Sequence, residues 1–188
     1  GVDVVLEGGQ TMSPSTDEIA QAIKQVHAHM IIILPNNKNI ILSAEQAAEL
    51  AEQDVYVVPT RTIPQGLGAV LAFQKEQKAE TNVARMKESA QQVRTGEVTY
   101  AVRDTTIEGR TICKGDYLGI ADGRIVSNRS DLLQTAEELL TEMIDEETEM
   151  VTLFYGQDVP AEDAERWFSQ LESRFPDVEM ELHAGEQP

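Results

Sequence analysis

The sequence lacks the residue patterns that mark most metal and catalytic centres. Cys113 is the only cysteine among 188 residues, which excludes an internal disulfide and a cysteine-rich metal site. The histidines, His27, His29 and His183, have no carboxylate or cysteine at metal-ligand spacing. Walker loops, G-x-G-x-x-G turns and G-x-S-x-G elbows are also missing. We therefore expect neither a catalytic residue nor a metal site in this chain.

Long hydrophobic runs are absent as well. The longest, MIIIL at residues 30–34, has the length of a strand, whereas a membrane-spanning helix needs about 20 apolar residues. The chain starts directly in the strand-like VDVVLEG, without a basic stretch or a cleavage site. We expect a cytoplasmic protein without membrane insertion, and the abrupt start indicates a piece of a longer polypeptide.

Basic residues are scarce, and the acidic excess is uneven. The net charge is −18; residues 1–95 hold 11 acids and 8 bases, residues 96–129 hold 5 and 5, and residues 130–188 hold 17 and 2. Such a surface repels nucleic acid and anionic lipid and accelerates encounter with a basic protein. The charge excludes nucleic acid as a partner and leaves two interpretations of the acidic end, solubility and docking.

The first 74 residues alternate between expected strands and helices. Strands are predicted at 2–8, 29–36 and 55–60, and helices at 15–26, 43–53 and 63–73. Two capping boxes, Ser15 with Glu18 and Ser43 with Gln46, are expected to begin the first two helices. Because parallel neighbours need crossover helices, this order predicts an α/β subdomain with a doubly wound parallel sheet over residues 1–74.

The rest of the chain predicts a connecting helix and a second subdomain. Residues 75–95 are polar with one narrow apolar stripe, typical of a helix packed on one side. Short strands are expected at 98–104, 105–112, 116–121 and 124–128, with a hairpin turn at Asp122-Gly123. A helix at 130–145 and a strand, helix and strand at 149–156, 160–175 and 178–185 follow. Residues 96–188 thus predict an acidic, mixed α/β subdomain with a β meander and a βαβ element.

Polar loops follow all three strands of the first subdomain and should gather at the carboxyl edge of its sheet, where such folds bind ligands. One interpretation is an anion held by glycine amides, a helix N-terminus and two cations. The other is that the polar groups bond to one another and fix the loops. The candidates are Gly8, Gly9, Gln10, Thr11, Ser13, Asn36, Asn37, Lys38, Asn39, Thr60, Arg61, Thr62 and Gln65.

Acidic candidates for partner binding lie on and after the helix at 130–145, whose apolar residues are expected to face the core. They are i, i+4 neighbours or close in sequence, which is also the usual appearance of a solvated face. The candidates are Glu137, Glu138, Glu142, Asp145, Glu146, Glu147 and Glu149.

Five motifs carry a resemblance to a known family. EGGQTMSPST, LPNNKNI, VPTRTIPQG, GEVTYAVRDT and MIDEETEMVTLFYG occur in this order. They resemble the carboxy-terminal region of the bacterial fatty acid kinase A subunit, the YloV-like family related to dihydroxyacetone kinases, over essentially the whole chain. The resemblance implies a longer protein with an amino-terminal ATP-binding domain and a middle domain with catalytic cysteine and histidines. That protein would phosphorylate a fatty acid carboxylate presented by a separate DegV-type fatty-acid-binding protein.

For the present chain, the resemblance implies a non-catalytic docking domain with a fold similar to the DegV-type carrier. Its partners would be that carrier and other domains of the same kinase chain. ATP and Mg²⁺ would bind in the missing amino-terminal domain, because the sequence offers no aspartate cluster or Cys/His set to carry over. One alternative is a small-molecule site at the loop edge, for phosphate, an acyl-phosphate or a fatty acid. Another is a purely architectural role, in which the chain holds the kinase domains at a fixed separation.

Overall fold

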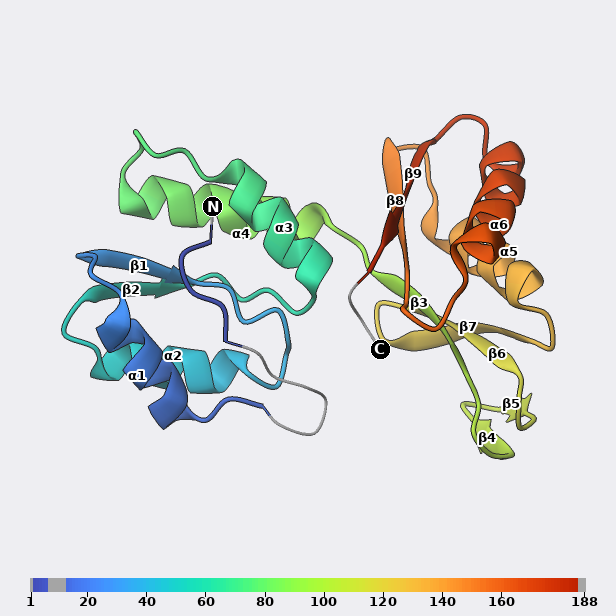
Figure 1. The fold of residues 1–188 in the computed structure, drawn as a ribbon, viewed down its shortest axis with the longest axis horizontal. Coiled ribbons are helices and arrows are strands. Elements are labelled where there is room, and N and C mark those ends of the chain that lie inside the picture. The colour runs from blue at the N-terminus through green and yellow to red at the C-terminus, as the bar shows by residue number, and fades with distance from the viewer. Residues whose placement is uncertain (1, 7–12, 186–188) are drawn as a thin grey trace. The chain divides into compact units, whose positions relative to one another are not determined.

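The computed structural model describes residues 2–6 and 13–185. The chain divides into two compact units, Gly1–Thr95 and Gly96–Pro188, which Figure 1 colours blue to green and green to red. Each unit has a hydrophobic core of its own. None of the helices within the described ranges combines the length and hydrophobicity of a membrane span.

The first unit is built on two parallel strands, β1 (Met30–Ile33) and β2 (Asp54–Val57). The helices α1 (Thr16–Gln25) and α2 (Ile41–Leu50) cover one face of this sheet, and α3 (Ile63–Ala72) and α4 (Ala79–Gln92) cover the other (Figure 1). Alternate strand residues face opposite ways, so Ile31 and Val55 pack towards α1 and α2, whereas Ile32 and Tyr56 pack towards α3 and α4. The helix expected to connect the two subdomains is α4, which packs within this first unit.

The strand predicted at the amino terminus is wrong over its described part. Residues 2–6 have no regular secondary structure, and Val2 and Val5 are 63% and 73% exposed. Residues 7 and 8 lie outside the described residues. High β-propensity does not make a strand unless the segment also pairs with a neighbouring strand, and β1 and β2 pair only with each other in the described part of the chain.

Of the two predicted capping boxes, the first is confirmed and the second is wrong. Ser15 and Glu18 exchange both hydrogen bonds at the start of α1. The helix α2 instead begins at Ile41, which places Ser43 inside its first turn. A turn closed by Asn37 brings the chain into helical conformation two residues early, and Gln46 accepts a hydrogen bond from Thr16 at 3.1 Å.

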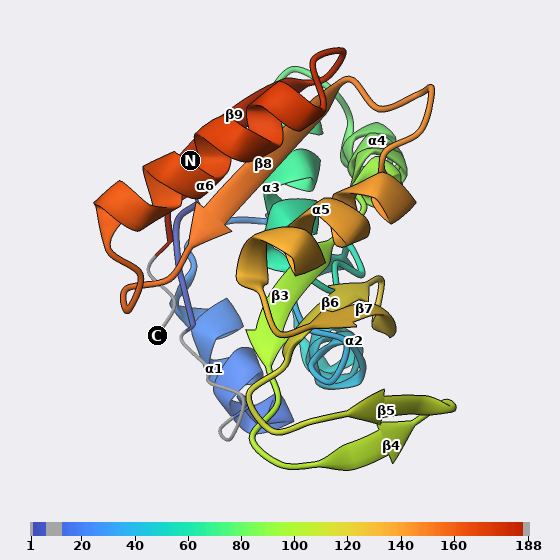
Figure 2. The ribbon, with the colours of Figure 1, turned by 90° about the vertical axis from the view of Figure 1, so that its right-hand side faces the viewer.

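The second unit contains the predicted antiparallel meander. The strands β3 (Gly96–Tyr100), β6 (Tyr117–Ala121) and β7 (Arg124–Arg129) pair in the order β3-β6-β7. Asp122 and Gly123 have φ values of 48° and 84°, which confirms the predicted hairpin turn. The single strand predicted at 105–112 is instead a hairpin of β4 (Thr105–Ile107) and β5 (Arg110–Ile112), turned at the positive-φ pair Glu108-Gly109 and visible at the bottom of Figure 2.

The predicted helix and βαβ element complete the second unit. α5 (Leu132–Met143) packs on the three-stranded sheet where Gly119 leaves room for it. The strands β8 (Met150–Tyr155) and β9 (Glu179–Ala184) are parallel and joined by α6 (Ala161–Arg174). The core of this part contains Leu140 of α5, Leu171 of α6 and Met180 of β9, and Val151 of β8 packs against it. The structure thus confirms a mixed α/β class.

Candidate functional site

The loops after β1 and β2 meet at the carboxyl edge of the sheet, as parallel pairing predicts, and Thr60 joins them. This residue is fully buried; its hydroxyl donates to Asn36 Oδ1 at 2.8 Å and accepts from the Asn36 N–H at 3.0 Å. Asn36 has a φ of 55°, a left-handed value that asparagine tolerates. Gly66 of α3 faces the same side chain, so close that a Cβ there would overlap it.

The neighbouring polar groups of this edge also bond within the protein. The Arg61 N–H donates to Gln65 Oε1 at 2.8 Å, and Thr62 caps α3 by accepting from the Gln65 N–H at 3.2 Å. The Thr62 hydroxyl also lies 3.0 Å from that of Thr95. Asn37 closes its own turn by accepting from the Asn39 N–H at 2.8 Å. These contacts favour the interpretation in which the loops fix one another.

Ligand binding at this edge stays a prediction. Lys38 and Arg61 are exposed, and neither of the two hollows described below is lined by a residue of these loops. Gly8, Gly9, Gln10 and Thr11, the proposed amide donors and their neighbours, lie outside the described residues.

Five of the seven acidic candidates form an exposed group, which we call the acidic turn: Glu142, Asp145, Glu146, Glu147 and Glu149. The Asp145 carboxylate organises it by accepting from the Glu147 N–H at 2.9 Å and from the Thr148 hydroxyl at 3.1 Å. The last turn of α5 has no basic residue. Acids at a helix C-terminus are repelled by the partial negative charge there, so this clustering costs stability.

Glu138 has a different environment, because it links α5 to β7. One carboxylate oxygen accepts from the buried Ser127 hydroxyl at 2.5 Å, and the other accepts from Arg129 Nε at 2.8 Å. The Ser127 hydrogen bond, followed by the hydrogen bond and charge of Arg129, holds the pKa of Glu138 below its ordinary value, against the opposing effect of burial. The half-buried Glu137 is its neighbour on the helix.

Replacing Glu138 by glutamine is expected to weaken the acid sensitivity of the second unit. The folded-state pKa of Glu138 lies below the ordinary carboxyl value of 4.5. The ionised carboxylate therefore stabilises the folded state fully at pH values above 4.5. This stabilisation is lost as the pH falls through the lowered folded-state pKa. Unfolding followed by the fluorescence of Trp167, the only tryptophan, measures the effect between about pH 3 and 7. S127A should reduce the pH dependence of the unfolding free energy in part. If E138Q loses stability on acidification as steeply as the wild type, the stabilising role of the Glu138 carboxylate is contradicted.

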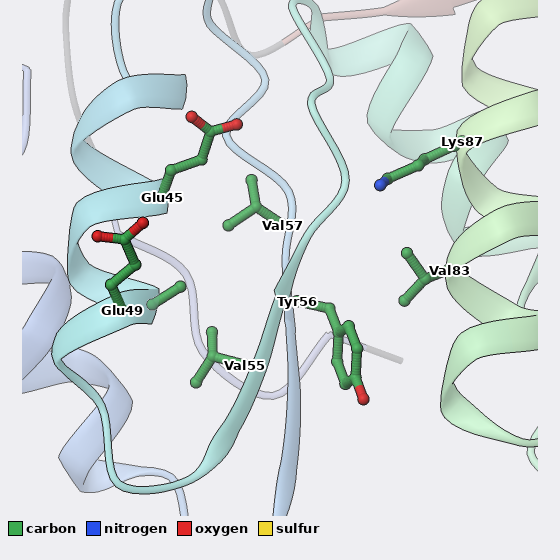
Figure 3. Close-up of a pocket in the computed structure, with 8 residues that line it drawn as sticks. Glu45, Glu49, Val55, Tyr56, Val57, Val83 and Lys87 are labelled. Carbon is green, nitrogen blue, oxygen red and sulfur yellow. The ribbon is translucent and has the colours of Figure 1, made fainter.

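A hollow of about 340 Å³ lies along the edge of β2 that faces away from β1. Figure 3 shows β2 running between α2, which supplies Glu45 and Glu49, and α4, which supplies Val83 and Lys87. The Tyr56 hydroxyl donates to Glu80 at 3.4 Å, and the charge of Glu80, followed by burial and Asp54, raises the pKa of Tyr56. A second hollow, of about 620 Å³, lies between the ends of α1 and α2.

Sequence reasoning missed the residues of the β2 hollow. The i, i+4 spacing of Glu45 and Glu49 was the available signal, but it is equally typical of any solvated helix. Their place beside an open strand edge depends on which strands pair, which the spacing does not encode. Within the described ranges, no group of three or more His, Cys, Asp or Glu side chains is placed to hold a metal ion.

Comparison with known proteins gives the chain a family. Residues 1–188 match the FakA-like C-terminal family, which is described as the C-terminal part of fatty acid kinase A-like subunits. The chain belongs to this family. It is 48% identical to protein YloV of Bacillus subtilis (strain 168) over 188 residues, covering 100% of this chain and 34% of YloV.

Two staphylococcal proteins are also similar to this chain. An uncharacterized protein of Staphylococcus saprophyticus is 44% identical over 191 residues, and one of Staphylococcus aureus (strain USA300) is 43% identical over 188 residues. Each match covers 100% of this chain and 34% of the relative. The chain thus spans about a third of the length of the curated relatives it matches.

Proposed function

We propose that this chain is a non-catalytic docking region of a fatty acid kinase, which binds a DegV-type fatty-acid-binding protein. The bound carrier would present its fatty acid carboxylate to the kinase domains of the longer protein for phosphorylation by ATP. ATP and Mg²⁺ would bind in those other domains, and the reaction would take place in the cytoplasm. The family membership carries the kinase part of this proposal.

The acidic turn supports the docking part. Its five carboxylates project from one helix end and the following turn, and all are exposed. Like charges gathered where a helix already has partial negative charge destabilise the free protein, and they become favourable when a basic surface covers them. A potential of this kind accelerates encounter and is compatible with release, which a kinase needs when it exchanges loaded carriers for spent ones.

Neutralising three residues of the acidic turn is expected to weaken carrier binding by about tenfold, since exposed charge pairs contribute up to roughly 1 kcal/mol each. The variant is E142Q/E147Q/E149Q, and calorimetry with the purified DegV-type protein measures the affinity. The same variant should be slightly more stable than the wild type, because it removes repulsion at the end of α5. Lost affinity therefore cannot be attributed to unfolding.

The matched control places the same charge change on α6, as E162Q/E165Q/E172Q, since these three glutamates are also exposed. We expect this variant to bind the carrier nearly as well as the wild type. Wild-type affinity should also fall steeply as the salt concentration rises from about 50 to 500 mM. Equal losses in both variants, or an affinity indifferent to salt, would contradict docking through the acidic turn.

A further inference from the structure

We infer that the free edge of β2, in the hollow of Figure 3, is a docking groove for an extended basic segment of another polypeptide, which adds to the sheet as a strand. This groove is separate from the acidic turn, and the inference does not depend on the proposed carrier docking. It follows from the backbone of β2, from the two helix walls and from their charges.

The backbone of β2 turns N–H and C=O groups towards the hollow, and none of the other described strands pairs with them. The Asp54 N–H donates to His29 O at 3.0 Å, and the Val58 N–H donates to Ile33 O at 3.0 Å, so the amides of these even positions face β1. Strand amides alternate in direction, which turns the N–H and C=O groups of Val55 and Val57 towards the hollow. In the described part of the chain, β2 has β1 as its only strand neighbour.

The two helices restrict what can reach this edge. α2 lies on one side of β2 and α4 on the other, and both helices line the hollow along the strand edge, so an added strand would lie between two helix walls. Unprotected edges are sites of strand addition, which natural proteins use for peptide recognition. Main-chain hydrogen bonds would supply affinity, and the side chains on the two walls would select the sequence.

The wall charges define the chemistry of the occupant. Glu45 and Glu49 lie one turn apart on α2, beside the Val55 and Val57 side chains (Figure 3), and both are exposed. Within the described ranges neither has an ion-pair partner among the salt bridges of the chain. A strand in the groove points alternate side chains at this wall, and Lys or Arg at those positions would complement it. Its other face would meet Tyr56 and Val83, which suit apolar side chains, and the exposed Lys87 of α4, which disfavours a second row of basic ones.

Two other occupants fit less well. A second copy that pairs its β2 antiparallel about a two-fold axis keeps both α2 helices on the same face, which brings Glu45 and Glu49 towards their own counterparts. The chain's own apolar segment, residues 2–6, contains no basic side chain and carries Asp3. The groove is therefore matched to a different polypeptide with alternating basic and apolar residues.

The test uses the capped peptide acetyl-KVKVKVK-amide and its acidic counterpart acetyl-EVEVEVE-amide, with amide hydrogen exchange in the whole chain followed by NMR. The basic peptide should slow exchange of the Val55 and Val57 amides at least about fivefold, and the acidic peptide should not. Because a basic peptide also contacts other acidic surfaces, these two amides rather than total binding are the readout. E45Q/E49Q should reduce the protection about three- to tenfold, whereas E162Q/E165Q should leave it unchanged.

A backbone variant separates strand addition from simple charge attraction. V57P removes an N–H that faces the groove and does not bond to β1, and edge positions tolerate proline. We expect it to abolish the slowed exchange at Val55 with an unchanged fold. Should it unfold, the basic peptide with all its backbone amides N-methylated supplies the same test, because it keeps the charges but cannot add as a strand. Equal effects of the two peptides, or protection confined to the acidic turn, would overturn the inference. So would concentration-dependent dimerisation through β2, or full protection of both amides without any peptide.

Discussion

Replacing Gly66 by alanine is expected to destabilise the first unit by about 2 kcal/mol, although alanine is the better helix former. In a helix interior the change would ordinarily stabilise by up to about 1 kcal/mol. Here the new Cβ would overlap the Asn36 side chain, which is held by the buried Thr60 hydroxyl. Overpacking costs about 1–3 kcal/mol, and displacing Asn36 also leaves Thr60 without its acceptor at about 1–3 kcal/mol. The loss therefore exceeds the gain.

Urea unfolding followed by far-ultraviolet circular dichroism measures this effect. Trp167 lies in the second unit, so its fluorescence transition serves as an internal control and should not move. The double variant N36G/G66A tests the cause, because glycine removes the overlap and also suits the positive φ at position 36. Its destabilisation should be smaller than the sum of the two single effects; strict additivity would show that Asn36 is not the obstacle.

Replacing Asn82 by alanine is expected to have a comparable effect, a loss of about 2–3 kcal/mol. Asn82 is a fully buried polar residue in the first turn of α4. Its Oδ1 accepts from the Gln74 N–H at 2.9 Å, and its Nδ2 donates to Gln74 O at 2.8 Å and to Gln77 O at 3.4 Å. The Asn82 side chain thus supplies the hydrogen-bond partners of backbone groups in the segment between α3 and α4. Alanine leaves those N–H and C=O groups of Gln74 and Gln77 without these partners.

The aspartate variant N82D gives this prediction a signature. Aspartate keeps an acceptor for the Gln74 N–H, but the ionised carboxylate cannot donate to either carbonyl and buries a charge. N82D should therefore be at least as unstable as N82A at neutral pH and recover on acidification, when the protonated carboxyl donates again. The free energies of unfolding of N82A and N82D, measured by urea unfolding at neutral and at acid pH, test this recovery. A pH-independent N82D, or an N82A as stable as wild type, would contradict the role.

Much of the fold could be predicted from local pattern. The apolar spacing of α1, including Ile19 and Ile23, places the buried face correctly, and the Asp122-Gly123 turn has the predicted conformation. The predictions failed where a contact with another segment of the chain determines the local structure. Val2 and Val5 have strand-forming side chains but no strand partner, and the Asn37 turn rather than Ser43 sets the start of α2.

The candidate site was predictable only in part, for the same reason. Sequence reasoning grouped Glu138 with Glu142 and Glu147 because all are acids close together in the chain. The structure separates them, since Ser127 and Arg129 of a neighbouring strand reach Glu138 but not the acidic turn. The loop residues Asn36 and Thr60 were recognised as meeting at one edge, but their mutual hydrogen bonds depend on side-chain geometry across 24 positions.

By itself, the sequence determined the order of most helices and strands, the concentration of acids after residue 130 and the family, because these are properties of neighbouring residues or of the chain as a string. Tertiary structure alone decided which strand edge is open, which carboxylate is engaged and which polar loops close on themselves. Each of these depends on groups that are distant along the chain and near in space. Local propensity carries no information about such contacts, since only the packing of helices against strands brings the groups together.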